Sequence, residues 1–394
     1  MTAAPRNQIP VAAPASILAL APNAWDGPWL NRQQLLSRIG RRHYVLYSTG
    51  ASNRDAPDRP TWRPRATVQD HVTVDVLPGW MATALRQPIL REATMHGLAW
   101  HWRRVLRGPR QGPIVAWCFH PKFWPYIPHL RPERLVYHAY DLYHSQGHWD
   151  AERAESERAL VTRADVVLAS SQRIADYLRS RGAMNPLVVE NAADYAAFAL
   201  DAPQVAEPSD LAAIPRPRVG YTGSLNRKVD FPLLARLASQ HPEWQFVLVG
   251  AVGNLDADTT AAITQLRALP NAHFLGFKTP SDLPQYVIGM DVNLLAYRVS
   301  GDVWTEGIYP LKLHEYLAAG RPVVSADLPS VRPFADVVRM AKADDAWDSL
   351  IAAGLRDTGA DGVRARRQVA RQNDWDARVE ILENVLSGFR AGER

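Results

Sequence analysis

The sequence predicts an α/β protein of two domains, each a parallel sheet covered by helices. The first observation is length, because 394 residues are too many for one ordinary hydrophobic core. The second is that short apolar runs alternate with helical segments along the chain, as in parallel α/β units. The third is a polar, proline-rich break from about residue 200 to residue 218, which is typical of an interdomain linker.

Seven strands and four helices are predicted before the linker. Each strand is a short apolar run that ends at polar or turn-forming residues, and each helix lies between two such runs. The predicted strands are Ile17–Leu20, Tyr44–Tyr47, Val72–Val76, Ile114–Phe119, Leu135–Tyr140, Val166–Ala169 and Leu187–Val189. The predicted helices are Leu30–Ile39, a stretch within Met81–Leu106, Ala151–Thr162 and Ser171–Arg181.

The same alternation restarts after the linker. The predicted strands are Arg218–Tyr221, Gln245–Val249, Ala272–Phe274, Val292–Leu295, Pro322–Ser325 and Val337–Met340. The predicted helices are Phe231–Gln240, Ala261–Leu269, Leu283–Ile288, Pro310–Ala319, Asp345–Ala352 and, at the end of the chain, Asp376–Leu386. Two halves of similar rhythm predict two Rossmann-like domains that face a cleft.

These patterns suggest four parts. The Ala- and Pro-rich residues 1–15 have no apolar signal-peptide core, so we expect a flexible tail there. Residues 16–205 form the first domain, residues 206–375 the second, and residues 376–394 a terminal helix.

Composition favours a folded protein of the cytoplasm. The hydrophobic content is 47%, the charged content is 22%, and the sequence contains no apolar run of the ~20 residues that cross a bilayer. The single cysteine, Cys118, excludes an internal disulfide and fits a reducing compartment. It lies in an apolar run and is expected to be buried.

The segment from Trp80 to Arg110 is basic, with six arginines, one acid (Glu92) and interleaved tryptophans. A helix of this composition can lie in the headgroup region of an anionic membrane. The alternative is a solvated helical face whose tryptophans point into the core. Nucleic-acid binding is not expected, because no recognition motif accompanies the charge.

The segment Glu306–Asp327 has polar residues where a phosphorylated ligand would sit. Pro310 suits the first turn of a helix, and Gly320 suits the residue just past its end. The start of that helix offers N–H groups and positive dipole to an anion, and Lys312 adds a full charge. Glu315 follows one turn later and is placed to accept two sugar hydroxyls. The alternative is a surface helix with a Lys–Glu pair three residues apart.

This segment resembles the donor-binding motif of the GT-B-fold retaining glycosyltransferases of family 4, and is similar to a bacterial subgroup with the pattern P-x-K-x-x-E-Y-L-A-A-G. Pro310, Glu315 and Ala318-Ala319-Gly320 match in order and spacing. The first glutamate of the motif does not match, because Gly307 takes its place and Glu306 lies one residue earlier. The resemblance implies the GT-B fold, a C-terminal helix that crosses back to the first domain, a nucleoside-diphosphate sugar as donor, and retention of configuration.

The run Val219–Ser224 ends the first strand of the second domain with two glycines. Glycine permits positive φ and close backbone approach, so the N–H groups there can face a diphosphate. Ser224 occupies the place where the resembled family often has arginine, and we expect Lys228, or else Arg227, to supply the charge. The alternative is a basic surface turn.

Positioned cations can stabilise the departing diphosphate without a metal ion. The sequence has no clustered Asp-x-Asp, and we predict neither a metal site nor a cofactor. Gly250 ends the next strand at its carboxyl edge, where open α/β sheets bind ligands. Phe277 and Lys278 follow the strand after that, and the resemblance implies that this loop lies against the nucleotide base. The predicted donor-binding residues are Gly223, Ser224, Arg227, Lys228, Gly250, Phe277, Lys278, Glu306, Tyr309, Lys312 and Glu315.

The first domain is expected to bind the acceptor. His138 and Asp141 end a strand, and Asp141 could orient an acceptor hydroxyl or pass on its proton, although a capping role is the alternative. His120 follows another strand, and Trp29 and Arg32 follow the first strand, where an arginine could hold an acceptor phosphate. Packing of the aromatic rings is the competing explanation. The predicted catalytic residues are Asp141, Lys228 and Glu315.

We therefore predict a metal-independent glycosyltransferase of the hexosyltransferase type that acts in surface polysaccharide or glycoconjugate synthesis. Its acceptor would be a saccharide or a polyprenyl-linked saccharide, and its place the cytoplasm or the inner face of the membrane. Two alternatives remain: a sugar-nucleotide epimerase of the same fold, and a non-catalytic saccharide-binding subunit. Hydrolase and zinc motifs are absent from the sequence.

Overall fold

The computed structural model describes residues 14–27, 29–52, 67–69, 71–75, 77–78, 80–108, 112–145, 149–201, 206–253, 255–299, 303–342 and 346–388. The chain divides into two compact units. The first contains the described residues of Met1–Ser170, Ile174–Val189 and Arg378–Arg394, and the second those of Ser171–Arg173 and Glu190–Ala377. The division at residue 190 precedes the proline-rich segment, much of which lies in the second unit. Most of the predicted tail lies outside the described residues.

The first unit is built on an eight-stranded sheet with the order β3-β4-β2-β1-β5-β6-β7-β8. Every neighbouring pair is parallel except β3 and β4. The strands are β1 (Ser16–Leu20), β2 (Tyr44–Ser48), β3 (Thr67–Gln69), β4 (Val72–Asp75), β5 (Ile114–Cys118), β6 (Arg134–Ala139), β7 (Val166–Ala169) and β8 (Leu187–Val188). All seven predicted strands are present. The additional strand β3 is short and mostly exposed, so it has no apolar run to reveal it.

The helices of this unit follow the strands that they connect. They are α1 (Asn31–Ile39), α2 (Trp80–Ala84), α3 (Pro88–Arg107), α4 (Ile127–Leu130), α5 (Ala151–Arg163) and α6 (Gln172–Ser180), and the 3-10 helix η2 (Pro121–Tyr126) follows β5. Cys118 is fully buried, as expected. Within the described residues, no helix has both the length and the apolar character needed to cross a membrane.

The second unit has a six-stranded, fully parallel sheet with the order β11-β10-β9-β12-β13-β14. The strands are β9 (Arg218–Thr222), β10 (Gln245–Val249), β11 (Ala272–Gly276), β12 (Val292–Leu295), β13 (Val323–Ala326) and β14 (Arg339–Ala341). All six predicted strands are present.

The helices of the second unit cover both faces of its sheet. They are α7 (Tyr195–Phe198), α8 (Ser209–Ala212), α9 (Phe231–Gln240), α10 (Ala257–Arg267), α11 (Leu283–Gly289), α12 (Val303–Gly307), α13 (Lys312–Ala318), α14 (Ala346–Arg356) and α15 (Ala360–Gln372). The last helix, α16 (Trp375–Ser387), belongs to the first unit from Arg378 onward, in agreement with the expected crossover.

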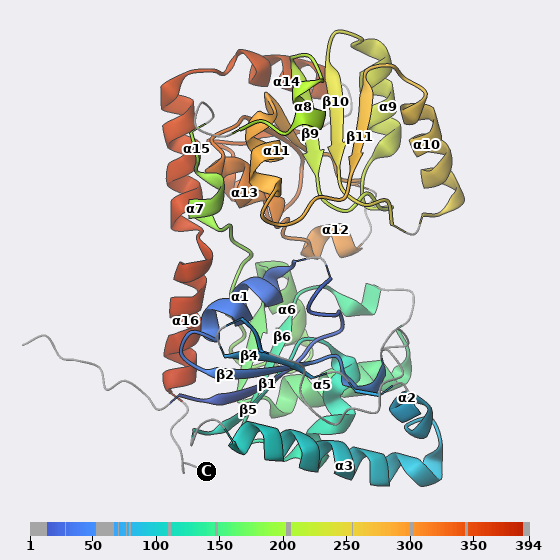
Figure 1. Cartoon of the computed structure of the whole chain (residues 1–394), viewed down its shortest axis with the longest axis vertical. Helices are drawn as coiled ribbons and strands as arrows, with labels where there is room; N and C mark the ends of the chain where they lie inside the picture. Colours follow the sequence, from blue (N-terminus) through green and yellow to red (C-terminus); the bar gives the residue numbers. More distant parts are fainter. Residues whose placement is uncertain are drawn as a thin grey trace, which may run out of the picture. The chain divides into compact units, whose positions relative to one another are not determined.

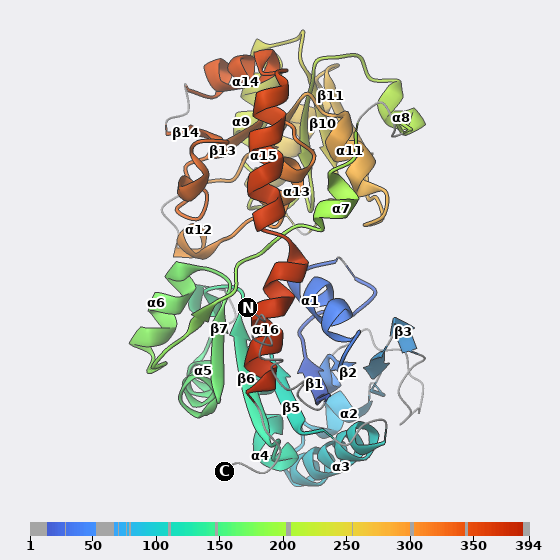
Figure 2. The ribbon, with the colours of Figure 1, turned by 90° about the vertical axis from the view of Figure 1, so that its left-hand side faces the viewer.

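Two expectations about helices were wrong. Helix α13 begins at Lys312, and Pro310 lies before it in a turn whose carbonyl accepts the Leu313 N–H at 3.2 Å. Helix α15 was not predicted, because its sequence is mostly polar and arginine-rich. It packs along α13 (Figure 2), and a Cβ at Gly320, where φ is +71°, would lie 2.8 Å from Val363 of α15.

The four residues of β10 after Gln245 are all apolar, because both faces of the strand are buried there. Phe246 and Leu248 belong to the core that contains α9 and α10, whereas Val247 and Val249 belong to a second core with α8 and α11. Figure 1 shows β9, β10 and β11 side by side, with α9 and α10 on one side of them and α11 on the other. A strand buried on both faces needs an apolar residue at every position.

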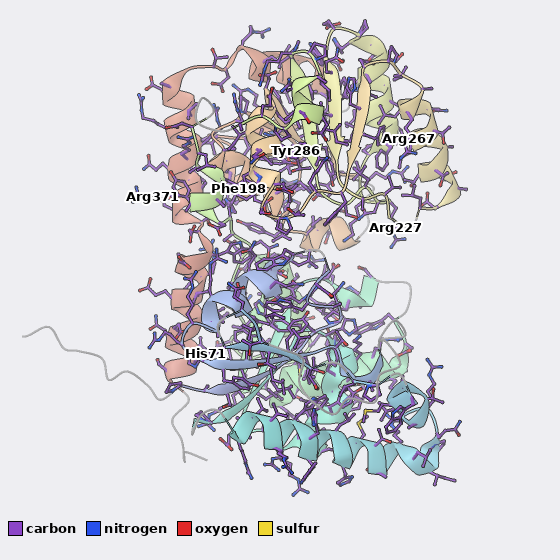
Figure 3. All side chains as sticks on the ribbon, viewed as in Figure 1. His71, Phe198, Arg227, Arg267, Tyr286 and Arg371 are labelled. Atoms are coloured by element: carbon purple, nitrogen blue, oxygen red, sulfur yellow. The ribbon has the colours of Figure 1, made fainter. Side chains whose placement is uncertain are left out.

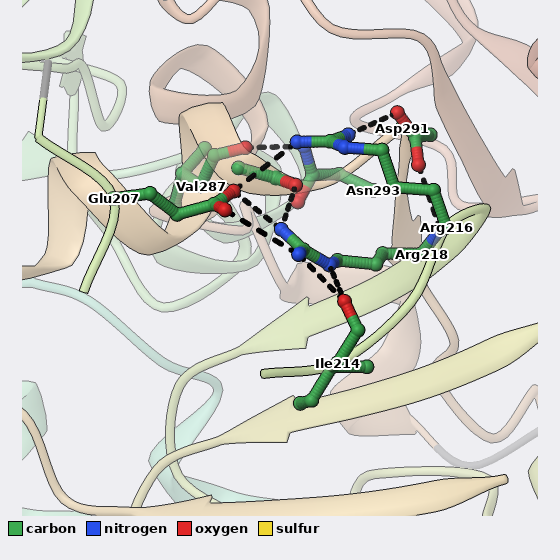
Figure 4. Close-up of polar contacts among 8 residues, drawn as sticks. Glu207, Ile214, Arg216, Arg218, Val287, Asp291 and Asn293 are labelled. Atoms are coloured by element: carbon green, nitrogen blue, oxygen red, sulfur yellow. Dashed lines mark hydrogen bonds and ion pairs between the residues drawn. The ribbon is translucent and has the colours of Figure 1, made fainter. Parts of the chain in front are cut away.

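A polar network fixes the segment that leads into β9 (Figure 4). The Arg218 guanidinium is 3% exposed, donates to the Ile214 carbonyl at 2.8 and 2.6 Å, and pairs with Glu207. That pairing holds the pKa of Glu207 below its usual value. Arg216 pairs with Asp291 and Glu207 from the exposed side. The network therefore joins the start of β9 to the start of β12.

We predict that Arg218→Met lowers the free energy of unfolding of the second unit by about 1–3 kcal/mol, because it leaves the Ile214 carbonyl without its buried hydrogen-bond donor. Arg216→Met is the control, and its half-exposed pairs are worth about 0–1 kcal/mol. Urea denaturation of both variants measures the difference. Equal losses would contradict the assignment of Arg218 as the anchor.

Candidate active site

The strand order of the second unit fixes where a ligand can bind. The chain leaves β9 for β10 on one side and returns to β12 on the other side of β9. In open α/β sheets the loops diverge at such a point and leave a crevice at the carboxyl ends of the strands. The loops after β9 and β12 therefore flank the candidate site.

Two glycines, Gly223 and Gly250, lie directly after β9 and β10 at this site. Gly223 and Gly250 have φ of +130° and +151°, and Gly223 donates its N–H to the Val249 carbonyl at 2.8 Å. A Cβ on Gly250 would lie 1.9 Å from the Gly223 carbonyl oxygen. A Cβ on Gly223 would lie 2.9 Å from the Lys312 side chain. The missing Cβ of Gly223 leaves room for Lys312. The predicted approach of this backbone to a diphosphate stays a prediction.

Lys312 lies at the centre of the cluster. Its Nζ donates to the Tyr297 hydroxyl at 2.9 Å and to the Tyr221 hydroxyl at 3.2 Å. The Nζ also lies 4.7 Å from the ring centroid of Tyr221 and 5.2 Å from that of Tyr297. Lys312 thus joins the end of β9 to the loop after β12 and carries a positive charge that these neutral phenols do not balance.

Glu315 lies one turn after Lys312, and in the described part of the chain its carboxyl group has no hydrogen-bond partner, whereas its backbone carbonyl accepts the Ala319 N–H at 3.0 Å. Burial raises the pKa of Glu315 to about 7, and the nearby charge of Lys312 acts in the opposite direction. A carboxyl group without partners at the edge of a crevice can take hydrogen bonds from a ligand.

The loop after β9 carries Ser224, Arg227 and Lys228. Ser224 is exposed, and its Oγ accepts from Asn226 at 3.3 Å. The Lys228 backbone accepts the Arg298 N–H at 3.0 Å, which fixes the loop against the chain after β12. Arg227 is exposed at the edge of the unit (Figure 3). The roles predicted for these side chains stay predictions.

Four other predicted donor residues differ in whether their side chains already have partners within the protein. Lys278 pairs with Asp210 at 2.6 Å, whereas Phe277 next to it is 63% exposed. Glu306 pairs with Arg173 at 2.7 Å. Tyr309 is buried, and its hydroxyl lies 2.8 Å from His314 Nε2. Of this group, Phe277 leaves the largest surface for a ligand.

The predicted acceptor residues lie at the carboxyl edge of the sheet of the first unit. Trp29 packs edge-on against Trp25, which is itself buried against Tyr47. His138 is fully buried, and burial with the charge of Arg32 lowers its pKa to about 3. Trp25 is therefore a packing residue, as the alternative to acceptor binding predicted. His138 has no surface that a ligand could contact.

Asp141 and His120 remain near the surface of that edge. Asp141 Oδ1 accepts the N–H of the next residue, Leu142, at 2.9 Å, and both roles weighed for Asp141 stay predictions. His120 Nδ1 accepts the Lys122 N–H at 3.0 Å. Sequence reasoning missed Tyr221 as a partner of Lys312. The one signal in the sequence for Tyr221 was its position two residues before Gly223, in the strand that leads to this glycine.

The first unit also brings three possible metal ligands together. Glu92, His96 and His129 have ligand atoms within 4.8 Å of one another on α3 and α4. This cluster belongs to the first unit, whereas Lys312 and Glu315 belong to the second. The prediction that the reaction needs no metal stays a prediction.

Comparisons with known proteins agree with this geometry. Residues 216–356 match the family model described as Glycosyl transferases group 1. TuaH of Bacillus subtilis (strain 168), named as a teichuronic acid biosynthesis glycosyltransferase, is 30% identical over 233 residues. The match covers 56% of this chain and 56% of TuaH, so the chain spans about half the length of the curated relative that it matches.

Solved structures resemble nearly the whole chain. Alr3699/HepE of Anabaena in complex with UDP-glucose superposes with a TM-score of 0.68 at 18% identity, over 94% of this chain and 99% of that one. Sucrose-phosphate synthase of Thermosynechococcus elongatus superposes with a TM-score of 0.70 at 16% identity, over 95% and 98%. At these identities the likeness shows the fold, and it confirms the predicted GT-B fold.

The pKa of Glu315 makes its contribution to stability depend on pH. Below the usual glutamate value of 4.5 the carboxyl is protonated in both states. Between 4.5 and about 7 the unfolded chain loses the proton while the folded protein keeps it, so stability falls as pH rises. We predict that Glu315→Gln is more stable than the parent by about 1–3 kcal/mol at pH 8 and equal to it near pH 4.5. Urea denaturation at both pH values measures this, and a gap that does not change with pH would refute it.

Proposed function

We propose that this chain, whose residues 216–356 match the family model described as Glycosyl transferases group 1, transfers a sugar from a nucleoside-diphosphate donor to a saccharide acceptor. The observation that carries the proposal is the Lys312 ammonium at the strand switch point, next to a backbone corner that only glycine can form. A cation beside a backbone that a ligand can approach closely suits a diphosphate.

The chemistry follows from where charge develops. As the bond between the anomeric carbon and the diphosphate oxygen breaks, the diphosphate gains negative charge. Lys312 stabilises that charge more in the transition state than in the ground state, which is the kind of interaction that accelerates a reaction. Glu315, as a carboxylate, accepts hydrogen bonds from sugar hydroxyls of the nucleotide.

Retention of configuration and the acceptor type extend the proposal. The acceptor oxygen bonds to the anomeric carbon on the face from which the diphosphate leaves, and the acceptor proton passes to the departing phosphate. Asp141 orients the acceptor hydroxyl. The name of TuaH supports an acceptor of the surface polysaccharide class, either a free saccharide or a lipid-linked one.

A saccharide-binding subunit without turnover is the second candidate. The displaced glutamate favours it, because Glu306 pairs with Arg173 and the place of the first motif glutamate belongs to Gly307. Turnover of a donor in the presence of an acceptor separates the two candidates, since only the enzyme releases nucleoside diphosphate.

We predict that one class of UDP-, GDP- or dTDP-sugar raises the melting temperature of the protein, because only the folded state binds the donor. Lys312→Met should weaken that binding at least tenfold and lower transfer further still, since Lys312 acts most on the leaving charge. Arg364→Gln, an exposed charge change on α15, is the control and should change neither. Unchanged donor binding in Lys312→Met would overturn the proposal.

We also infer that the enzyme works at an anionic membrane surface, through an exposed face of α3. Ile89 is 92% exposed and Trp100 is 62% exposed, and both lie on one helical stripe with Arg104 and Arg107. The Arg104 guanidinium lies 5.4 Å from the Trp100 ring. Trp102, in contrast, is buried in the core, so only part of the predicted tryptophan set is available.

We predict that the parent protein sediments with phosphatidylglycerol vesicles and not with phosphatidylcholine vesicles. Combining Trp100→Ser, Arg104→Gln and Arg107→Gln should weaken this binding at least tenfold, because each basic residue near the surface contributes about 1 kcal/mol. Arg364→Gln with Arg371→Gln on α15 is the control of similar charge. The inference is wrong if the α3 variant binds as the parent does.

A further inference from the structure

Two helices of the first unit bring three side chains together that the proposed reaction does not use. Glu92 and His96 lie one turn apart on α3, and His129 lies on α4. One ligand atom from each of them lies within 4.8 Å of the other two. In the described part of the chain, this is the one group of three histidine, cysteine or acidic side chains that lie so close. We call these three residues the His–Glu cluster.

Helix α4 is attached to α3 at both of its ends. The Tyr126 ring, directly before α4, packs edge-on against the buried Trp102 of α3, with ring centroids 5.3 Å apart. Directly after α4, the Arg131 carbonyl accepts a hydrogen bond from the Arg103 side chain of α3 at 3.2 Å. Figure 2 shows the two helices next to each other. The fold therefore sets the positions of the three side chains before any ligand binds.

The distances within the His–Glu cluster suit a metal ion better than an ion pair. Glu92 Oε2 lies 3.8 Å from His129 Nε2 and 3.9 Å from His96 Nδ1, which is too long for a hydrogen bond to either ring. A zinc ion about 2.1 Å from each ligand atom holds these atoms roughly 3.3 Å apart, so side-chain shifts on the order of 1 Å close the set. Glu92 and His96 are 70% and 71% exposed in their side chains and can make such shifts.

The two imidazole rings have a geometry that fits one shared ion. Their centroids are 4.8 Å apart with an interplanar angle of 74°. Two imidazoles on one tetrahedral zinc have centroids roughly 5 Å apart, given a Zn–N distance of about 2.0–2.1 Å. His96 Nδ1 lies 2.9 Å from the Glu92 backbone carbonyl, which can only accept, so Nδ1 donates and Nε2 is left for an ion. Histidines that bind metals are commonly oriented by such a bond to a carbonyl.

We propose that the His–Glu cluster binds a zinc ion that joins α3 to α4, with water completing the coordination. Two imidazole nitrogens and one carboxylate suit zinc and its first-row neighbours, whereas Mg²⁺ and Ca²⁺ prefer oxygen ligands alone. The site needs neither a donor nor an acceptor of sugar, so this inference goes beyond the proposed function and does not depend on it.

Isothermal titration with zinc chloride tests the site, using the untagged full-length chain after a chelator has removed bound metal. We expect one ion per chain with micromolar or tighter affinity, and no displacement of zinc by magnesium chloride. Glu92→Gln, His96→Gln and His129→Gln should each weaken binding at least tenfold, because each variant keeps only two of the three ligands. Cys118 is fully buried, so its thiol does not compete for the ion in the folded protein.

His71→Gln is the matched control. His71 is exposed in the turn before β4 (Figure 3) and lies outside the His–Glu cluster, so this variant should bind zinc as the parent does. If the cluster variants bind zinc as the parent does, or the parent binds it more weakly than in the micromolar range, zinc is an adventitious ion only and the inference is overturned. Because Glu92 and His96 are mostly exposed, their variants decide the matter if His129→Gln does not fold.

Thermal unfolding tests whether the ion joins the two helices. Zinc should raise the melting temperature of the parent, because only the folded protein brings the three ligands together. His129→Gln keeps both ligands of α3 and loses the one on α4, so it should lose this rise. A rise in His129→Gln equal to that of the parent would overturn the link between α3 and α4.

Discussion

The close approach of two backbone turns is the constraint on which the candidate active site depends. The Gly250 α-carbon lies so near the Gly223 carbonyl that a methyl group would overlap the oxygen, at 1.9 Å. Because neither glycine has a side chain, Lys312 can reach the ends of β9 and β12 and donate hydrogen bonds to the Tyr221 and Tyr297 hydroxyls. Any larger residue at Gly223 would push Lys312 away. The charge that a diphosphate needs is therefore positioned by residues that carry no chemistry themselves.

The same change of strand order occurs in both sheets. It lies between β1 and β5 in the first unit and between β9 and β12 in the second, and open α/β sheets bind ligands at such points. In the second unit one lysine is surrounded by neutral phenols. In the first unit Lys122 has two arginines as its charged neighbours, which lower its pKa to about 8 after burial. Topology thus decides where ligands bind, whereas the loop residues decide which ligands these are.

The sequence predicted those features that depend on neighbours along the chain. Apolar runs located the strands, and the glycine turns were correctly expected to have positive φ. The sequence could not predict contacts between residues that are distant along the chain. Nothing local shows that Lys278 pairs with Asp210, 68 positions earlier, or that His138 is fully buried. Helix α15 was missed because its stability depends on packing against α13 rather than on an apolar stripe of its own.

The displaced glutamate does not by itself exclude transfer. In the second unit the Gly307 carbonyl accepts the Ser171 hydroxyl at 3.0 Å, so the motif position offers a backbone oxygen that is already engaged. Glu306 pairs with Arg173, but both side chains are about half exposed. An exposed ion pair contributes about 0–1 kcal/mol, which is less than a carboxylate gains from hydrogen bonds to two hydroxyls. The pair with Arg173 is therefore weak enough for a ligand to break, and the contact of Glu306 with a donor sugar stays a prediction.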